Sequence, residues 1–480
     1  MISIKGGRTR LCDGITRRDF VRVGAIGSMG LGLPQLLQAE AQAAQIARAA
    51  GKSSKREKSC ILFFLMGGQS QLDMWDMKPN APEMIRGQFK PISTNVDGIQ
   101  ICEHMPELAK RADRFAIIRS MTHFAKNHAP ACYYALSGTA PKRDIVAFGL
   151  TADDYPAFGS VASLLKPATR PVPSYVQLSP ALIGDGGIQM PGLHAGFLGA
   201  KYDPLKVITD PNVDSFEVEE LSLPGEVSDR RLGDRRSLLK LVEDEFPLMA
   251  ESKAVGRMDQ FYQRAFNLVT SPDARRAFNI QAETPKMRER YGRNIYAQQL
   301  LLARRLVESG VRLVTIVWGG PINAPLDYWD THQGNFPKQK DKLIPIFDQC
   351  YSALLDDLKD RGMIDDTLVI AMGEFGRTPR IGQITANGGT DSTGRDHWPF
   401  CYSITLAGGG VQGGQVIGKS DDTTATFEER PVTPEDLTAT LYHALGIDHH
   451  THVRDQLNRP LPIVRNGEPV LELWGSAPHA

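Results

Sequence analysis

Acidic residues and histidines follow the ends of several apolar runs in this sequence. Zinc, manganese and iron accept carboxylate and imidazole ligands together, whereas calcium and magnesium prefer oxygen. A single group of this kind is better explained by capping or hydrogen bonding on a loop. Four groups that each follow an apolar run instead favour a site for one or two divalent ions. The groups are Asp73 with Asp76 after run 60–66, His123 with His128 after run 115–118, Asp330 with His332 after run 311–317, and Glu374 with Asp396 and His397 after run 367–371.

The spacing within these groups limits which side chains can share an ion. Asp330 and His332 are two residues apart, so both reach one ion only if the backbone bends between them. Asp396 and His397 are adjacent, and only one of them is expected to point into a site. Arg377 has two alternative roles, since its planar guanidinium suits an anionic substrate group and equally suits a salt bridge that orients Glu374.

The apolar runs predict the strands that must position these groups. Runs of four to seven apolar residues bounded by glycine or polar residues are typical of buried strands. They alternate with helical patterns, and Thr433 with Asp436 forms a helix start signal. The predicted strands are 60–66, 115–118, 175–178, 311–317, 367–371 and 401–406, and the predicted helices are 129–136, 294–309, 342–359 and 434–445.

This alternation predicts the fold class. Strands separated by helices form a mostly parallel sheet with helices on both faces. The carboxyl ends of parallel strands meet at one edge of the sheet, where α/β proteins bind ligands. We expect one domain over 59–465, with a helical insertion at about 230–290 and a C-terminal tail at 466–480.

Composition excludes several classes of partner. The 480 residues contain 55 basic and 55 acidic residues, so no basic excess indicates a nucleic acid or an anionic membrane as partner. No apolar run reaches the roughly 18 residues that a spanning helix needs, so we expect no transmembrane anchor. The cysteines are scattered without a CxxC pair, which predicts buried free thiols.

The N-terminus resembles a twin-arginine export signal. Thr16-Arg17-Arg18-Asp19-Phe20 is followed by a weakly apolar, glycine-rich segment and then by small residues spaced for signal peptidase, ending at Ala43. We therefore expect a signal peptide at 1–43 and a linker at 44–58. The signal predicts that the twin-arginine export machinery is a partner and that the protein is periplasmic or secreted.

One glycine-rich motif is not interpreted as a nucleotide site. Gly408 to Gly413 fits G-x-G-x-x-G after a predicted strand, but the next residues, GQVIGKSDD, are β-branched and turn-like. A dinucleotide site needs a helix N-terminus at that point to bind the pyrophosphate. The motif therefore predicts a loop.

Five segments together resemble a known family. GGQSQLDMWDMKP, NHAPACYYALSG, YWDTHQGNF, GEFGRTPR and GRDHWP occur in this order within 60–465. They resemble a family of exported bacterial proteins defined only as a domain of unknown function, which is similar to a distant branch of the alkaline phosphatase and sulfatase superfamily. The resemblance implies a three-layer α/β/α sandwich, one or two metal ions at the strand ends, and hydrolysis of phosphate or sulfate esters.

The resemblance also implies roles for single residues. Glu374 stands where the superfamily has a metal-binding aspartate, and His397 stands for a later metal-binding histidine. Asp330 and His332 resemble the metal-binding Asp and His pair, although the superfamily pair is spaced more widely. The first metal-binding aspartate follows strand one, where Asp73 is the nearest acid, with Asp76 next to it.

The nucleophile position departs from the superfamily pattern. Counting back from Ser137-Gly138 places His128 where sulfatases have their modified cysteine, so formylglycine chemistry does not follow. A histidine there could bind metal, act as a general base or accept a phosphoryl group. Ser120 and Thr122 are alternative hydroxyl nucleophiles, and a metal-activated water would need none of these residues.

These observations give two hypotheses. The first is an exported metal-dependent hydrolase of sulfate or phosphate esters, acting on a small-molecule or carbohydrate ester. Its ion would be zinc, calcium, magnesium or manganese, with His128 as ligand or base and Arg377 as anion clamp. The second is a non-catalytic exported protein that binds a ligand or partner. It is favoured by His128 at the nucleophile position and by Phe375, which stands where the superfamily has a His or Asn. The expected metal ligands of the hydrolase are Asp73, Asp330, His332, Glu374 and His397.

Overall fold

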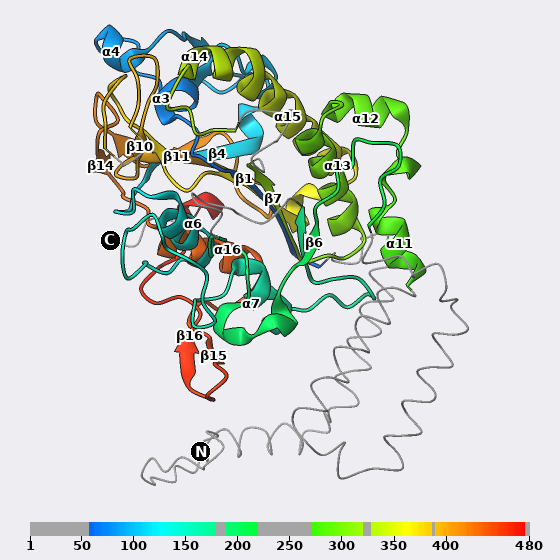
Figure 1. Cartoon of the computed structure of the whole chain (residues 1–480). Coiled ribbons are helices and arrows are strands. Elements are labelled where there is room, and N and C mark those ends of the chain that lie inside the picture. The colour runs from blue at the N-terminus through cyan, green and yellow to red at the C-terminus, as the bar shows by residue number, and fades with distance from the viewer. Residues whose placement is uncertain (1–56, 179–188, 219–270, 320–327, 386–388, 476–480) are drawn as a thin grey trace, which may run out of the picture. The chain divides into compact units, whose positions relative to one another are not determined.

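An eight-stranded sheet forms the centre of the computed structural model (Figure 1). The structure describes residues 57–178, 189–218, 271–319, 328–385 and 389–475. In spatial order the strands are β12 (Gln415–Ile417), β4 (Phe115–Met121), β11 (Tyr402–Ala407), β8 (Thr367–Met372), β1 (Ser59–Leu65), β7 (Leu313–Trp318), β5 (Tyr175–Leu178) and β6 (Leu205–Val207).

The sheet is mostly parallel, as the sequence predicts. β1 lies in the middle and pairs in parallel with β7 on one side and β8 on the other. β11 is the exception within this sheet, since it runs antiparallel to both β8 and β4. The parallel strands therefore bring the segments that follow β1, β4, β7 and β8 to one edge of the sheet.

Helices cover both faces of the sheet, which confirms a three-layer α/β/α sandwich. Alternate residues of β1 enter two separate cores: Ile61, Phe63 and Leu65 face one, and Cys60, Leu62 and Phe64 face the other. Each strand is therefore apolar on both sides, and this produces the continuous apolar runs of the sequence. The first core is covered by α5 (Pro106–Ala109), α11 (Pro272–Phe278), α12 (Pro285–Tyr291), α13 (Ile295–Glu308) and α15 (Ile344–Asp360), and the second by α6 (His128–Ser137), α7 (Phe158–Leu165) and α16 (Pro434–Ala444).

The predicted helix boundaries follow capping residues. The side chain of Asn294 accepts a hydrogen bond from the backbone of Ala297 and starts α13. Thr433 and Asp436 form the expected capping box at the start of α16. The sequence does not predict β6 and β12, because each has only three residues. Residues 408–413 form a loop, as predicted, and β12 follows at the point where a dinucleotide site would need a helix.

Several predictions concern residues outside the described ranges. They are the signal peptide at 1–43, most of the linker, and the insertion between 230 and 270. The described part of that insertion is helical, with α11 and α12. Val470 and Leu473 are buried in the second core, so packed structure continues beyond residue 465. Within the described ranges, no helix is both long enough and apolar enough to cross a bilayer.

Candidate metal centre

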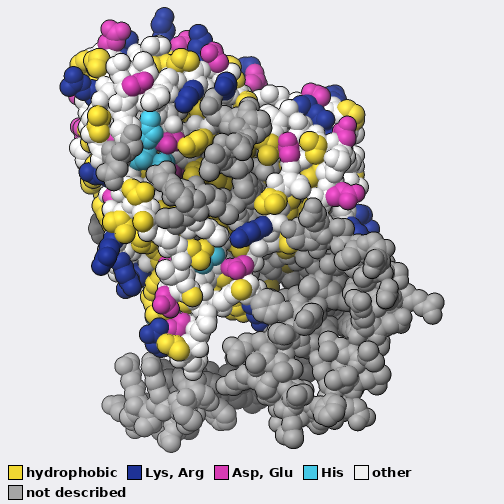
Figure 2. Space-filling model, in the orientation of Figure 1, with side chains coloured by type: hydrophobic (Ala, Val, Ile, Leu, Met, Phe, Trp, Pro, Cys, Tyr) yellow, Lys and Arg dark blue, Asp and Glu magenta, His cyan; other side chains and the backbone are white. Residues whose placement is uncertain are grey.

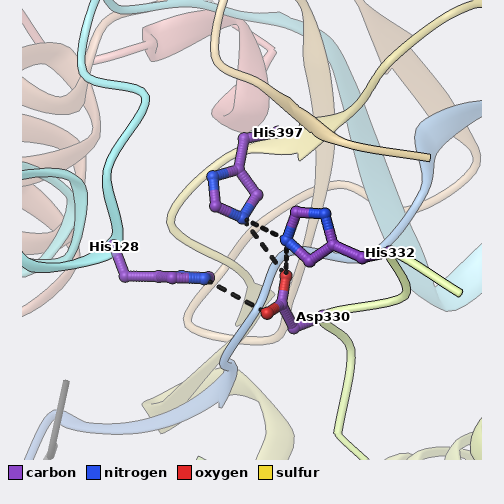
Figure 3. Close-up of side chains that lie close together, drawn as sticks. All are labelled: His128, Asp330, His332 and His397. Atoms are coloured by element: carbon purple, nitrogen blue, oxygen red, sulfur yellow. Dashed lines mark hydrogen bonds and ion pairs between the residues drawn. The ribbon is translucent and has the colours of Figure 1, made fainter. Parts of the chain in front are cut away.

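Four side chains from three segments converge at one edge of the sheet (Figure 3). His128 is the first residue of α6, which follows β4. Asp330 and His332 lie between β7 and α14 (Asn335–Lys338), where the backbone bends at residues 329 and 332. His397 is on β10 (His397–Trp398), which pairs with β9 (Gly376–Arg377) beyond the end of β8. These bends let Asp330 and His332 face the same point although they are two residues apart, and their Oδ1 and Nε2 atoms lie 2.9 Å apart.

Four distances between these donor atoms are close to the edges of a tetrahedral site, and all the donor atoms lie within 4.8 Å of one another. The Nε2 atoms of His332 and His397 lie 3.0 Å apart, and the Nε2 atom of His397 lies 3.2 Å from Oδ1 of Asp330. The Nε2 atom of His128 lies 3.4 Å from Oδ2 of the same aspartate. Ligand atoms around a tetrahedral zinc ion are about 3.3 Å apart, given bonds of about 2.0 Å. Three imidazoles and one carboxylate therefore fit a single divalent ion.

Two of the three imidazoles are held from behind through their other nitrogen, Nδ1. The Nδ1 atom of His128 lies 2.7 Å from Oε1 of Glu374, and that of His397 lies 2.7 Å from the carbonyl oxygen of Lys126. Both partners are acceptors, so Nδ1 of each ring carries a hydrogen, and Nε2 turns a lone pair toward the cluster when the ring is neutral. The Nδ1 atom of His332 lies 3.5 Å from Asp396. Outer partners of this kind orient histidines that bind metals.

Glu374 stands behind this cluster, although the sequence predicted it as a ligand. Its side chain is fully buried, and both carboxylate oxygens accept from the backbone N–H of Gly67, at 2.9 and 3.0 Å. The imidazole of His123 faces the backbone carbonyl of Glu374 at 2.6 Å. Glu374 therefore links the end of β1 to His128. In this geometry it supports a ligand and does not itself belong to the ligand set.

Gly67 is also needed for close packing against the cluster. Its φ of +102° is unfavourable for other residues, and an added Cβ would lie 2.3 Å from the backbone nitrogen of Asp330. The Gly67-Gly68 pair after the first apolar run was the sequence signal for this contact. From the sequence alone, the two glycines indicate only where the predicted strand 60–66 ends.

Arg377 orients the aspartate of the cluster. Its guanidinium is fully buried and donates to Oδ1 of Asp330 and to the backbone carbonyls of Gly67, Gly68 and Arg395. It makes no recorded contact with Glu374 among the described residues. Of its two expected roles, the geometry fits a structural ion pair, but with Asp330 as the partner in place of Glu374.

Asp73 lies apart from the four residues of the cluster. Its buried carboxylate accepts from Arg395 at 3.0 Å and from the side chains of Asn335 and Gln339. The short α3 (Gln71–Met74), capped by Ser70, turns this side chain toward α14. Asp73 thus neutralises a buried arginine, a role that its place after the first strand did not reveal.

The predicted hydroxyl nucleophiles have no recorded contact with the cluster. The hydroxyl of Ser120 is buried and donates to the backbone carbonyl of Arg430. Among the described residues, no hydroxyl or thiol hydrogen-bonds to the side chains of His128, Asp330, His332 or His397.

The charges around the cluster favour one positive charge at His128. Burial lowers the pKa of His128, but the charges and hydrogen bonds of Asp330 and Glu374 outweigh burial and raise that pKa to about 10. Burial and the charge on His128 lower the pKa of His397 to about 3. Burial would raise the pKa of Asp330, yet the charges of Arg377 and His128 hold it well below its usual range. A proton or a metal ion could supply the favoured charge, so the two compete.

The cluster is partly open to solvent. The side chains of His128, His332 and Asp330 are 20%, 18% and 12% exposed, whereas Glu374 and Arg377 behind them are fully buried. Figure 2 shows histidine and acidic side chains together at the surface of one face of the molecule. An ion at the cluster could therefore meet a molecule from solvent on that side.

Comparison with solved structures finds several distant likenesses. They include BT1596, a 2-O GAG sulfatase (11% identity, TM-score 0.41, 88% of this chain and 75% of that chain). A phosphonate monoester hydrolase from Silicibacter pomeroyi matches at 12% identity and a TM-score of 0.38, over 88% of this chain and 78% of that one. A protein in the alkaline phosphatase superfamily from Vibrio parahaemolyticus matches at 11% identity and a TM-score of 0.38, over 83% of this chain and 68% of that one. Likenesses this distant carry no inference about function.

Sequence comparison gives a family. No curated protein matches the chain. Residues 57–474, which include the whole sheet and all four residues of the cluster, match the family described as "Protein of unknown function (DUF1501)". The chain therefore belongs to the DUF1501 family.

Proposed function

We propose that this protein is a metal-dependent hydrolase of sulfate or phosphate esters. The observation that carries the proposal is the convergence of His128, Asp330, His332 and His397, with the imidazole nitrogens of His128 and His397 oriented from behind. Three nitrogen donors and one carboxylate suit zinc or manganese better than calcium or magnesium. Four protein ligands around one ion leave room for a substrate oxygen if the ion becomes five-coordinate.

The residues of the cluster have distinct tasks in this proposal. A bound divalent ion would polarise the ester oxygen and lower the pKa of a water molecule. His128, Asp330, His332 and His397 would hold the ion. Glu374 fixes the ring of His128, and Arg377 fixes the carboxylate of Asp330. Since no hydroxyl or thiol in the described part of the chain hydrogen-bonds to the side chains of the cluster, water is the nucleophile that the geometry favours.

Export remains part of the proposal on sequence grounds. The twin-arginine pattern at residues 16–20 supports a periplasmic or secreted protein that is folded before transport. The resemblance of the five motifs supports a small-molecule or carbohydrate ester as substrate.

A hydrolysis panel tests the proposed activity. The purified protein is loaded with zinc or manganese and assayed on aryl sulfates, phosphomonoesters and phosphodiesters. We expect turnover of one class that stops when a chelator removes the ion, and that is lost in His332→Gln but kept in His104→Gln, a histidine that packs against Phe89. A metal-loaded protein with no turnover above buffer would refute the hydrolase.

The second candidate is a non-catalytic protein that binds a ligand through its ion. The absence of a hydroxyl or thiol nucleophile at the described cluster favours it as well. The same preparation distinguishes the two functions, because a binding protein would hold the ion and bind sulfate or phosphate esters without consuming them.

A further inference from the structure

A second group of histidines lies just after α16. Four of the chain's 11 histidines fall between residues 443 and 452. One donor atom from each of Asp448, His449 and His450 lies within 4.8 Å of the others. These residues form the turn between α16 and β15 (His452–Arg454), and none of them belongs to the cluster around Asp330.

The turn is fixed by its own hydrogen bonds. The backbone N–H of His450 donates to Oδ1 of Asp448 at 3.0 Å, and that of Thr451 donates to the carbonyl of Asp448, also at 3.0 Å. The rings of His449 and His450 lie side by side, with centroids 4.0 Å apart. Two imidazoles and a carboxylate are thus held together before any ligand arrives, which lowers the entropic cost of binding.

A second carboxylate reaches this turn from the C-terminal segment. Oε2 of Glu468 lies 3.3 Å from Nε2 of His449, and the backbone of Glu468 is held by a 2.9 Å hydrogen bond to Asp436. The Nε2 atom of His449 is buried and makes no hydrogen bond to any described residue. A separation of 3.3 Å without a hydrogen bond fits two ligands of one ion, for which about 3.3 Å is expected.

The position of the turn also favours a cation. It follows the C-terminal end of α16, an 11-residue helix whose last carbonyl groups carry partial negative charge. Imidazole together with carboxylate selects zinc, copper or nickel over magnesium or calcium. We propose that Asp448, His449, His450 and Glu468 form a second, surface site for a zinc-class divalent ion. The ion would connect the turn after α16 to the C-terminal segment, and the inference does not depend on the proposed hydrolase.

Zinc counting tests this site. The purified full-length chain is dialysed against buffers of increasing free zinc at neutral pH, and bound zinc is measured by elemental analysis. We expect two zinc ions per chain, and one in the double variant His449→Gln with His450→Gln. Glu468→Gln is expected to weaken the second ion by at least about tenfold, by analogy with the loss of other groups that support metal sites.

Two further variants separate this site from the central cluster. His332→Gln should lose the other zinc ion, and His104→Gln should keep both. Since His450 and Glu468 are exposed, the variants should fold, which far-UV circular dichroism verifies. The proposal is overturned if the double variant binds as much zinc as His104→Gln at every free zinc concentration, or if His332→Gln removes all bound zinc.

Discussion

Replacing Glu374 with glutamine tests whether this residue supports the metal centre or binds the ion itself. The substitution keeps the size of the side chain but replaces one carboxylate oxygen with an NH₂ group. Oε1 of Glu374 accepts from both His128 and Gly67, and Oε2 accepts from Gly67. In either orientation, the NH₂ group faces an N–H of Gly67 or of His128, so one donor meets another donor.

The size of the effect follows from this geometry. If Glu374 only orients His128, its loss should lower metal affinity by about 10–100-fold, as found for outer partners of metal-binding histidines. At about 1.4 kcal/mol for each tenfold change, this is about 1.4–2.8 kcal/mol of binding free energy. The number and type of ligands would stay the same, because His128, Asp330, His332 and His397 remain.

The assay combines affinity with coordination. Zinc affinity is measured by competition with a coloured chelator, and cobalt substitution reports the ligand set through its visible absorption bands. Asp73→Asn is the matched control, because Asp73 is an equally buried carboxylate whose partners are Arg395, Asn335 and Gln339. We expect this control to lose stability, by roughly 3–5 kcal/mol for a broken buried ion pair, but to keep the cobalt spectrum and the zinc affinity of its folded fraction.

Two results would contradict the proposed role of Glu374. One is an unchanged zinc affinity in Glu374→Gln, which would mean that the 2.7 Å contact with His128 has no effect on the site. The other is a cobalt spectrum altered in the same way as that of His332→Gln, which would make Glu374 a ligand, as the sequence alone predicted.

Three further predictions concern the framework. Gly67→Ala should cost about 1–3 kcal/mol of folding stability in urea unfolding and weaken zinc binding, because the new Cβ would lie 2.3 Å from the backbone nitrogen of Asp330; equal zinc affinity would contradict this. Asp356→Asn should cost about 1 kcal/mol at neutral pH, as a partly exposed ion pair does. Burial raises the pKa of Asp356, but hydrogen bonds and charge from arginines, chiefly Arg111 and Arg114, outweigh burial and lower the pKa to about 2. The stabilisation by Asp356 is thus present above the unfolded pKa of about 3.9 and is lost as the pH falls through about 2. A difference in unfolding free energy between Asp356→Asn and the native chain that persists below a pH of about 2 would refute this prediction. Thr433→Ala removes the hydrogen bond that the backbone N–H of Asp436 donates to Oγ1 of Thr433 at 3.2 Å. It should lower the free energy of unfolding by about 1 kcal/mol, whereas Thr433→Ser, which keeps the hydroxyl, should not.

The sequence predicted the layers of the fold because burial on both faces leaves a strong pattern. Strands β1 and β8 appear as apolar runs, and α13 as an amphipathic helix ended by Gly310. The antiparallel direction of β11 left no such pattern, since its residues are buried on both faces like those of its parallel neighbours. Direction depends on the path of the chain between strands, which composition does not record.

For the metal centre, the sequence by itself determined the candidates and their edge of the sheet. Asp330, His332 and His397 could be named because they follow predicted strands. His128 could be named because it follows the predicted strand 115–118 and stands at the nucleophile position of the superfamily that the sequence resembles. Only the tertiary structure decided which side chain faces the cluster and which stands behind it. Glu374 and Asp73 are both buried carboxylates beyond strand ends, yet one supports His128 and the other neutralises Arg395. The physical reason is that a ligand set depends on distances of about 3 Å between atoms from segments that are far apart in the sequence.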